Sequence, residues 1–283
     1  MTLRDLVASA LAEDLGPLGD ITSALLPAGA SADAALVPRA GGVLAGRAPA
    51  DEAFRQVDPS TVVEWTVDDG DRVVAGAAIA RVRGRLASVL TAERTALNFL
   101  CHLSGIATLT RRYVEAAAPA RVRDTRKTTP GLRALEKAAV RAGGGVNHRG
   151  NLSDGILVKD NHLGGLSVEE AVERARRLWP GRTVQVECDT AEQVKAAVVA
   201  GAELVLLDNM SPDEVRSCVA LVAGRALVEV SGGVTLDTVA AYAAAGPDLI
   251  AVGAITHSAP VLDIGLDLAQ VPVRGGNRAG SSG

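Results

Sequence analysis

The sequence predicts an α/β protein whose C-terminal part is a parallel sheet or a (β/α) barrel. From residue 121 onward, short apolar runs typical of strands alternate with runs typical of helices. The later strand-like runs recur about every twenty residues, as βα units do. No G-x-G-x-x-G motif follows the first run, so a dinucleotide-binding fold is not supported. The predicted strands are 121–124, 155–158, 184–188, 204–207, 227–230 and 249–252, and helices are expected over 131–142, 168–178, 191–200, 212–222 and 235–245.

Composition narrows the class of protein. The chain has 283 residues, 48% of them hydrophobic, which is enough for one large domain or two smaller ones with a buried core. Aromatic residues make up only 2%, so Ala, Val, Leu and Ile must build that core, and no base-stacking platform is expected. The net charge of −4 also argues against nucleic-acid binding.

The cysteines and the N-terminus indicate the compartment. Cys101, Cys188 and Cys218 lie far apart and form no CxxC pair, so we interpret them as reduced thiols of a cytoplasmic protein, not as a disulfide framework or zinc site. The N-terminal stretch 1–16 carries acids within a helical pattern and is interpreted as a helix, not a signal peptide. No apolar stretch reaches membrane-spanning length, and no membrane partner is expected.

The N-terminal part contains a misleading motif. The GDxVxxGxxI pattern over 69–79 is typical of β-modules that carry lipoyl or biotinyl groups, but no lysine precedes Lys127, which excludes a carrier role. We therefore expect a structural β-rich unit.

His102, in an apolar helix, is interpreted as a core histidine. The other expected elements are helices over 3–15, 51–57, 88–104 and 106–118, and strands over 32–39, 42–46 and 61–66.

Charged or small residues follow every predicted strand of the C-terminal part. In a barrel such positions face one mouth, where active sites are built. The first two strands end in cations, the middle two in carboxylates, and the last two in turns of small residues. The residues are Asp124 with Arg126 and Lys127, Lys159, Glu187, Asp208 with Asn209, Ser231 with Gly232 and Gly233, and Gly253 with Ala254.

This order suits a ligand with negative charge at both ends. Gly-rich loops after the last strands commonly hold a phosphate, and Glu187 and Asp208 could hold Mg²⁺ or sugar hydroxyls. The cations could bind a second anion, because Arg offers forked donors and Lys a compact charge. Taken singly, Glu187 or Asp208 would more often be a helix-capping acid, and His257 a loop histidine without a role.

The segment 124–162 concentrates basic residues in a chain that is acidic overall. A solvated helix face explains part of this density, because Arg133, Lys137 and Arg141 recur every four residues and Glu136 lies beside them. It explains the flanks poorly, where cations follow apolar strands. We therefore expect an anion site at the flanks.

Eight motifs resemble, in order, those of the quinolinate phosphoribosyltransferase family, also called carboxylating nicotinate-nucleotide pyrophosphorylase. They are EDLGPLGDIT at 13–22, ERTALNFLCHLSGIAT at 93–108, DTRKTTPGLR at 124–133, GGGVNHR at 143–149, LVKDNH at 157–162, LLDN at 206–209, SGG at 231–233 and VGAITHS at 252–258. The resemblance covers almost the whole chain except the tail. Two positions depart from it, Val146, often histidine, and Asn151, usually glycine. Neither removes a proposed charged contact, but both bear on the loop that carries His148 and Arg149.

The resemblance implies a domain organisation and an assembly. It implies an N-terminal α/β sandwich domain, which we place at 1–118, with the N-terminal helix a candidate to pack on the barrel. It implies an open (β/α) barrel of about seven strands, which we place at 119–270, completed by the C-terminal segment. Residues 271–283 are expected to be a disordered tail. The resemblance also implies a homodimer in which Arg94 is donated across the interface.

The resemblance also implies the reaction. Phosphoribosyl pyrophosphate and quinolinate would give nicotinate mononucleotide, pyrophosphate and CO₂ in de novo NAD biosynthesis, with Mg²⁺ as cofactor and no general acid or base assigned. The catalytic residues would be Lys127, Lys159, Glu187 and Asp208. The dicarboxylate would be held by Arg94, Arg126, His148, Arg149 and Lys159. Lys127 and Lys159 would lie near phosphoribosyl pyrophosphate. The ribose and, directly or indirectly, Mg²⁺ would be held by Glu187 and Asp208, and the 5′-phosphate by Ser231, Gly232, Gly233, Gly253, Ala254 and His257.

Three other functions stay open at this stage. The first is that of a paralogue found with molybdenum-transport genes, which has a different aromatic acid or nucleotide ligand. The second is a barrel aldolase that uses Lys159 as a Schiff-base nucleophile. The third is a non-catalytic protein that binds phosphoribosyl pyrophosphate. The full set of Arg94, Arg126, His148 and Arg149 favours the quinolinate enzyme.

Overall fold

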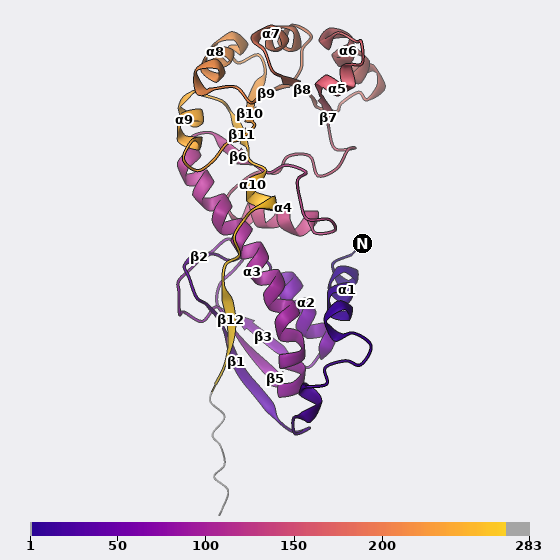
Figure 1. Ribbon diagram of the computed structural model, residues 1–283, viewed down its shortest axis with the longest axis vertical. Coiled ribbons are helices and arrows are strands. Elements are labelled where there is room, and N and C mark those ends of the chain that lie inside the picture. The colour runs from indigo at the N-terminus through magenta and orange to yellow at the C-terminus, as the bar shows by residue number, and fades with distance from the viewer. Residues whose placement is uncertain (1, 270–283) are drawn as a thin grey trace, which may run out of the picture.

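The computed structural model describes residues 2–269, and the predicted tail over 271–283 lies outside them. The described chain forms an N-terminal domain and a parallel-stranded C-terminal domain, joined by the long helix α3 (Figure 1). Each has its own apolar core. The α/β class predicted from the sequence is confirmed.

The N-terminal domain is built on an antiparallel sheet. Its strands are β1 (Ser31–Pro38), β3 (Val62–Trp65), β5 (Ala80–Arg85) and β12 (Ile264–Leu268), in the order β12-β1-β5-β3. The strand β12 contradicts the assignment of residues 119–270 to the barrel, because it pairs with β1 and not with the barrel sheet. Ile264 is only 3% exposed and packs in the N-terminal core, which explains why the chain returns there.

The first half of α3 packs on this sheet, and α1 (Leu3–Leu15) and α2 (Arg47–Val57) pack beside it in the same apolar core. The buried residues of α1, Val7 and Leu11, lie in the N-terminal core. Its main neighbours are α2 and α3, so the idea that this helix packs on the barrel is wrong. The short helix η1 (Ser23–Leu25) and the paired strands β2 (Gly42–Val43) and β4 (Arg72–Val73) complete the domain.

One helix replaces the two that were predicted over 88–104 and 106–118. Helix α3 (Leu86–Ala117) runs without interruption through Gly105. A side chain at Gly105 would come within 2.2 Å of the Pro260 carbonyl oxygen, so this glycine permits close packing and does not end the helix. The two domain cores therefore share one continuous helix.

The C-terminal domain is an open barrel of parallel strands flanked by helices (Figure 1). The six strands follow the order β6-β11-β10-β9-β8-β7, and β6 makes one further parallel bridge, from Arg123 to Val146. The prediction of about seven strands is therefore met only if this single bridge is counted. The strands are β6 (Arg121–Arg123), β7 (Ile156–Val158), β8 (Val184–Cys188), β9 (Leu204–Asp208), β10 (Leu227–Ser231) and β11 (Leu249–Ala251), and the helices are α4 (Arg133–Ala142), α5 (Asp160–Leu163), α6 (Val168–Leu178), α7 (Ala191–Val199), α8 (Pro212–Val222), α9 (Val239–Ala244) and α10 (Ala254–His257).

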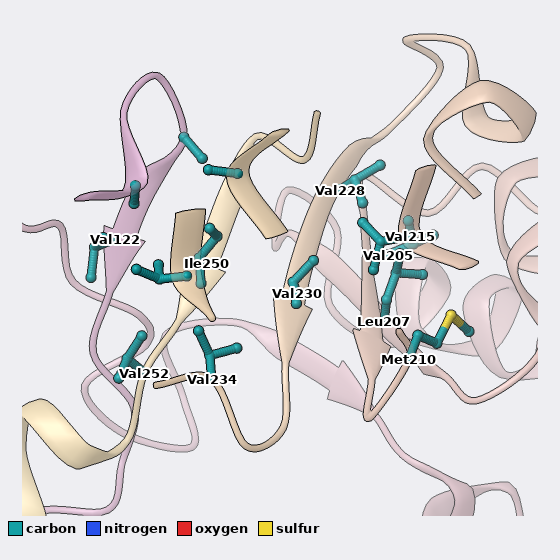
Figure 2. Close-up of a cluster of buried hydrophobic side chains, with 14 of the residues drawn as sticks. Val122, Val205, Leu207, Met210, Val215, Val228, Val230, Val234, Ile250 and Val252 are labelled. Carbon is teal, nitrogen blue, oxygen red and sulfur yellow. The ribbon is translucent and has the colours of Figure 1, made fainter. Parts of the chain in front are cut away.

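Local signals place the outer helices. Ser167, Thr190 and Ser211 begin α6, α7 and α8 with reciprocal capping boxes, in which each hydroxyl accepts from the backbone N–H three residues later. Within the strands, residues alternate between the helix layer and the barrel interior. Figure 2 shows Val122, Ile250, Val230 and Val205 on successive strands, among the side chains buried against the helices. The alternate positions are thereby left for the interior.

Among the described residues, no helix combines the length and the apolar character needed to cross a bilayer.

Candidate active site

A cavity of about 360 Å³ lies at the carboxyl ends of the barrel strands. It gathers residues from all six strands or from the segments that follow them, together with two residues of the 147–149 segment. Its lining consists of Thr125, Arg126, Lys127, His148, Arg149, Leu157, Lys159, Glu187, Leu206, Asp208, Glu229, Ser231 and Ala251. The sequence-predicted cations and carboxylates thus meet in one pocket.

The pocket has a charged rim and a partly apolar floor. Glu187, Asp208 and Ser231 end neighbouring strands, and Ser231 pairs in register with Asp208. Leu157, Leu206 and Ala251 occupy inward-facing positions of β7, β9 and β11 and form the floor. Cys188 is fully buried in the core, so it points away from the pocket.

The cations of the rim differ in what they contact. Lys159 forms an ion pair with Glu187. Arg149 donates to the Gly155 carbonyl at 3.2 Å, and its pKa is lowered by burial and by the nearby Arg126. Within residues 2–269, the side chains of Arg126 and Lys127 have no ion-pair partner. An incoming anion would therefore meet uncompensated positive charge.

Contacts from Lys137 on α4 and from Asp124 hold the segment that carries Arg149 in place. Asp124 and Lys137 form an ion pair in which the side chains are 0% and 7% exposed. The Asp124 carboxylate also accepts from the His148 N–H at 2.8 Å, and the Lys137 ammonium donates to the His148 carbonyl at 2.9 Å. The interpretation of α4 as a solvated face is therefore wrong at Lys137 and at Glu136, which is also buried. Glu136 also forms a hydrogen bond with His102 Nε2 at 2.8 Å.

The imidazole of His148 faces the pocket but is engaged on both sides. Its Nδ1 accepts from the Arg149 N–H at 2.7 Å, and its Nε2 lies 3.1 Å from Gln185 Oε1. Gln185 donates to Glu229 Oε2 at 2.8 Å, which also accepts from Arg123 at 2.7 Å. Burial lowers the pKa of His148 to about 4, and burial raises the pKa of Glu229.

The glycine-rich turns lie beside the pocket, and only Ser231 among them lines it. Gly232 has φ +97°, and a Cβ there would come 2.2 Å from Asn209 Oδ1, so only glycine fits. Gly253 approaches the aliphatic part of Lys127, where a Cβ would lie 3.2 Å from Cδ. Ala254 and His257 belong to α10, and His257 shares a 2.6 Å hydrogen bond with Ser258.

Arg94 does not reach this pocket. It lies exposed on α3 in the N-terminal domain and is absent from the lining residues. A separate cavity of about 390 Å³ is lined by residues of α1 and α3, including Glu13 and His102, but it lacks the cations of the barrel mouth.

The carboxylates are too few for a metal cage made by the protein alone. Residues 2–269 contain no cluster of three or more His, Cys, Asp or Glu side chains arranged to hold a metal ion. Glu187 and Asp208 nevertheless fit Mg²⁺, which usually keeps several waters and binds through one or two carboxylates plus substrate phosphates. The donor set is therefore compatible with an ion that arrives with its substrate.

Sequence reasoning missed three interior residues, Arg123, Gln185 and Glu229. The signal was present in the strand period, because Gln185 lies two positions before Glu187, and Glu229 two positions before Ser231. The signal for Gln185 and Glu229 is a polar residue at an inward-facing position of an otherwise apolar strand. The pattern of residues at the strand ends does not include this inner layer of side chains.

Together the fold and the pocket define a barrel protein whose active-site mouth suits a small polyanion that also carries hydroxyls or a metal ion. Sequence comparison then gives the family. The model described as "Quinolinate phosphoribosyl transferase, C-terminal domain" matches residues 106–267, and the corresponding N-terminal domain model matches residues 20–104. The chain belongs to the quinolinate phosphoribosyltransferase family.

Individual relatives agree. The chain is 46% identical over 276 residues to a carboxylating nicotinate-nucleotide pyrophosphorylase of Mycobacterium leprae, covering 94% of this chain and 96% of the relative. It is 41% identical over 272 residues to a probable enzyme of the same name from Bacillus subtilis, covering 95% and 94%. The molybdenum-associated alternative is therefore not favoured.

A solved structure supports the same assignment. The nicotinate-nucleotide pyrophosphorylase of Francisella tularensis superposes with a TM-score of 0.91 at 38% identity, covering 94% of this chain and 96% of that one. A human nicotinic acid phosphoribosyltransferase, at 16% identity and a TM-score of 0.63, shares only the fold.

Proposed function

We propose that this enzyme transfers the phosphoribosyl group of phosphoribosyl pyrophosphate to the ring nitrogen of quinolinate and releases pyrophosphate and CO₂, in NAD biosynthesis. The observation that carries the proposal is the charge pattern of the pocket. Arg126 and Arg149 lie together on one side, and Glu187 and Asp208 end strands on the other. This separation matches a dicarboxylate on one side and a ribose on the other.

The first step breaks the bond between C1 of the ribose and pyrophosphate and forms a bond from C1 to the pyridine nitrogen. Positive charge develops on the ribose and negative charge on pyrophosphate. Lys127 would stabilise the leaving group, and Glu187 and Asp208 would stabilise the ribosyl side. Arg126 and Arg149 would orient the ring, so that its nitrogen faces C1.

The second step is loss of the 2-carboxylate as CO₂. The positive charge of the quaternary ring nitrogen stabilises the electron pair that the broken carbon–carbon bond leaves on C2, and that carbon then takes a proton from solvent. No protein base is needed for this cleavage. Lys159, which pairs with Glu187, would add a cation beside the departing carboxylate.

The small residues after the last strands would hold the 5′-phosphate. These are Ser231, Gly232, Gly233, Gly253, Ala254 and His257. Support comes from the conformation of Gly232 and from the contact between Gly253 and Lys127, which bring backbone close to the pocket.

Mg²⁺ would be held by Glu187 and Asp208 together with the substrate, and it would supply charge neutralisation of the pyrophosphate. A homodimer would complete the site. Arg94 is exposed and distant from the pocket lining of its own chain, as a residue donated to a second copy would be. The free cysteines of the described chain agree with a reducing, cytoplasmic setting.

The test compares two acceptors. Purified protein with Mg²⁺ and phosphoribosyl pyrophosphate is incubated with quinolinate or with nicotinate, and nucleotide formation is followed by chromatography. Nucleotide is expected from quinolinate only, because a monoacid would leave one of the pocket arginines unpaired. Efficient turnover of nicotinate without CO₂ release would overturn the proposal. Borohydride trapping of Lys159 with a keto-sugar phosphate would instead indicate an aldolase.

A further inference from the structure

Four polar side chains form a chain across the barrel, at and just below the floor of the active-site pocket. Arg123 on β6 contacts Glu229 on β10, Glu229 contacts Gln185 on β8, and Gln185 contacts the His148 imidazole. Glu229 is 0% exposed, Gln185 5%, and the side chains of His148 and Arg123 are 10% and 16% exposed. Arg123, Glu229 and Gln185 have no role in the chemistry proposed above.

Contacts at the Gln185 end of this polar network determine which nitrogen of His148 carries the hydrogen. Glu229 Oε2 accepts from Arg123, so the group that Gln185 turns toward it must be its NH₂. The carbonyl oxygen of Gln185 is then left to face His148 Nε2 at 3.1 Å. A carbonyl only accepts, and therefore Nε2 must carry the hydrogen.

The contact between Arg149 and His148 leads to the same protonation of the ring by a separate argument. The backbone N–H of Arg149 can only donate, and it lies 2.7 Å from His148 Nδ1. Nδ1 must therefore be an unprotonated acceptor. Both ends thus select one form of the ring, neutral, with its hydrogen on Nε2.

An unsatisfied oxygen reinforces this choice. Glu229 Oε1 is buried and has no hydrogen-bond partner, and it lies 3.8 Å from His148 Nε2. A lone pair on Nε2 would face this carboxylate, whereas an N–H is attracted to it. The charged groups around the ring are Arg123 on β6, Lys137 on α4, Arg149 and Glu229, and burial with the three cations keeps the pKa of His148 at about 4.

We propose that Gln185 and Glu229 are positioning residues for the dicarboxylate site: they hold His148 as a neutral ring whose Nδ1 anchors the backbone of Arg149. The guanidinium of Arg149 is thereby kept in the pocket, and His148 is not a cationic ligand of the substrate. The proposal rests on the proposed function for the identity of the anion. The state of the ring does not depend on it.

The first experiment reads the ring directly. The chain has four histidines, so ¹⁵N-edited NMR of the imidazoles is tractable, and the variant His148→Gln assigns the signal. In the unliganded wild-type protein, His148 is expected to show a single Nε2–H tautomer that does not titrate between pH 8 and about 5. Gln185→Leu and Glu229→Gln should each shift and broaden the Nε2–H signal, because this hydrogen loses its fixed acceptor while the Arg149 N–H still bonds to Nδ1.

Kinetics test the consequence. Gln185→Leu should raise the KM for quinolinate about tenfold, as expected for one lost charged hydrogen bond in the site, and leave the KM for phosphoribosyl pyrophosphate within about twofold. The matched control is Cys188→Ala on the same strand, which removes a buried side chain of the opposite face and should change neither the His148 signal nor the ratio of the two KM values.

The outcomes separate cleanly. A His148 signal that is unchanged in both Gln185→Leu and Glu229→Gln, or one that titrates near pH 6.5 in the wild type, would overturn the proposal. Equal rises in both KM values would limit these residues to a structural role and would also overturn it. If the wild-type protein does not use quinolinate, the proposed function fails, but the NMR result still decides whether Gln185 and Glu229 fix the ring.

Discussion

Replacing Lys137 by Met tests whether the buried ion pair with Asp124 holds the loop that carries His148 and Arg149. The two side chains are 7% and 0% exposed, and Met keeps most of the aliphatic volume of Lys. Removing one partner of a buried pair typically costs about 3–5 kcal/mol. Asp124 would retain the N–H of His148 at 2.8 Å and the amide of Asn147 at 2.5 Å. We therefore expect a loss near the lower end, about 3 kcal/mol.

The assay uses the positions of the tryptophans. Trp179 lies just after α6 of the barrel and Trp65 on β3 of the N-terminal domain. In a Trp65→Phe background, urea unfolding followed by fluorescence reports on the barrel alone. The double variant Asp124→Asn with Lys137→Met should recover part of the loss, because it leaves no unpaired buried charge.

A surface pair gives the control. Arg216 and Asp213 are joined on α8 with side chains 58% and 90% exposed, so Arg216→Ala should change the unfolding free energy by no more than about 0.5 kcal/mol. A loss below about 1 kcal/mol in Lys137→Met would refute the argument that this pair anchors the loop.

Three further predictions concern pH, a turn and a departure from the family. The pKa of His148 falls from 6.5 to about 4 in the folded protein, so between these pH values only the unfolded state takes up the proton. The free energy of unfolding should therefore drop by up to about 3 kcal/mol from pH 6.5 to 4. The urea midpoint of His148→Gln should depend less on pH than that of the wild type. Gly232→Ala should cost at least about 2 kcal/mol through its clash with Asn209, whereas Gly233→Ala, with open space around it, should cost only about 1 kcal/mol for its positive φ. Asn151→Gly should leave kcat/KM within about twofold, because its side chain bonds only within its own loop.

The sequence located the rim of the site because strand ends in a barrel converge by geometry. Lys159, Glu187 and Asp208 each follow an apolar run, and this pattern is visible without coordinates. The interior layer of Gln185 and Glu229 was harder to see. A polar residue inside an apolar strand shows its function only when a partner from another strand is known, and such partners are set by sheet register.

The errors have a common physical origin, since each concerns a tertiary contact that overrides a local signal. The sequence pattern predicts a helix break at Gly105, but in the structure the backbone of Pro260 packs against this glycine and the helix continues. The sequence pattern predicts Lys137 and Glu136 to be surface charges, but in the structure both are buried and pair with Asp124 and His102. Residues 264–268 follow the barrel in sequence, yet they pair with β1. Periodicity carries no information about any of these contacts.

Carbon dioxide release tests the central claim. Quinolinate labelled at its 2-carboxylate is incubated with the protein and Mg²⁺, with and without phosphoribosyl pyrophosphate, and labelled CO₂ and nicotinate mononucleotide are counted together. The account predicts that both appear in equal amounts and only when phosphoribosyl pyrophosphate is present, because the ring nitrogen must be quaternised before the carboxylate leaves. Nucleotide without labelled CO₂, or labelled CO₂ without phosphoribosyl pyrophosphate, would contradict it.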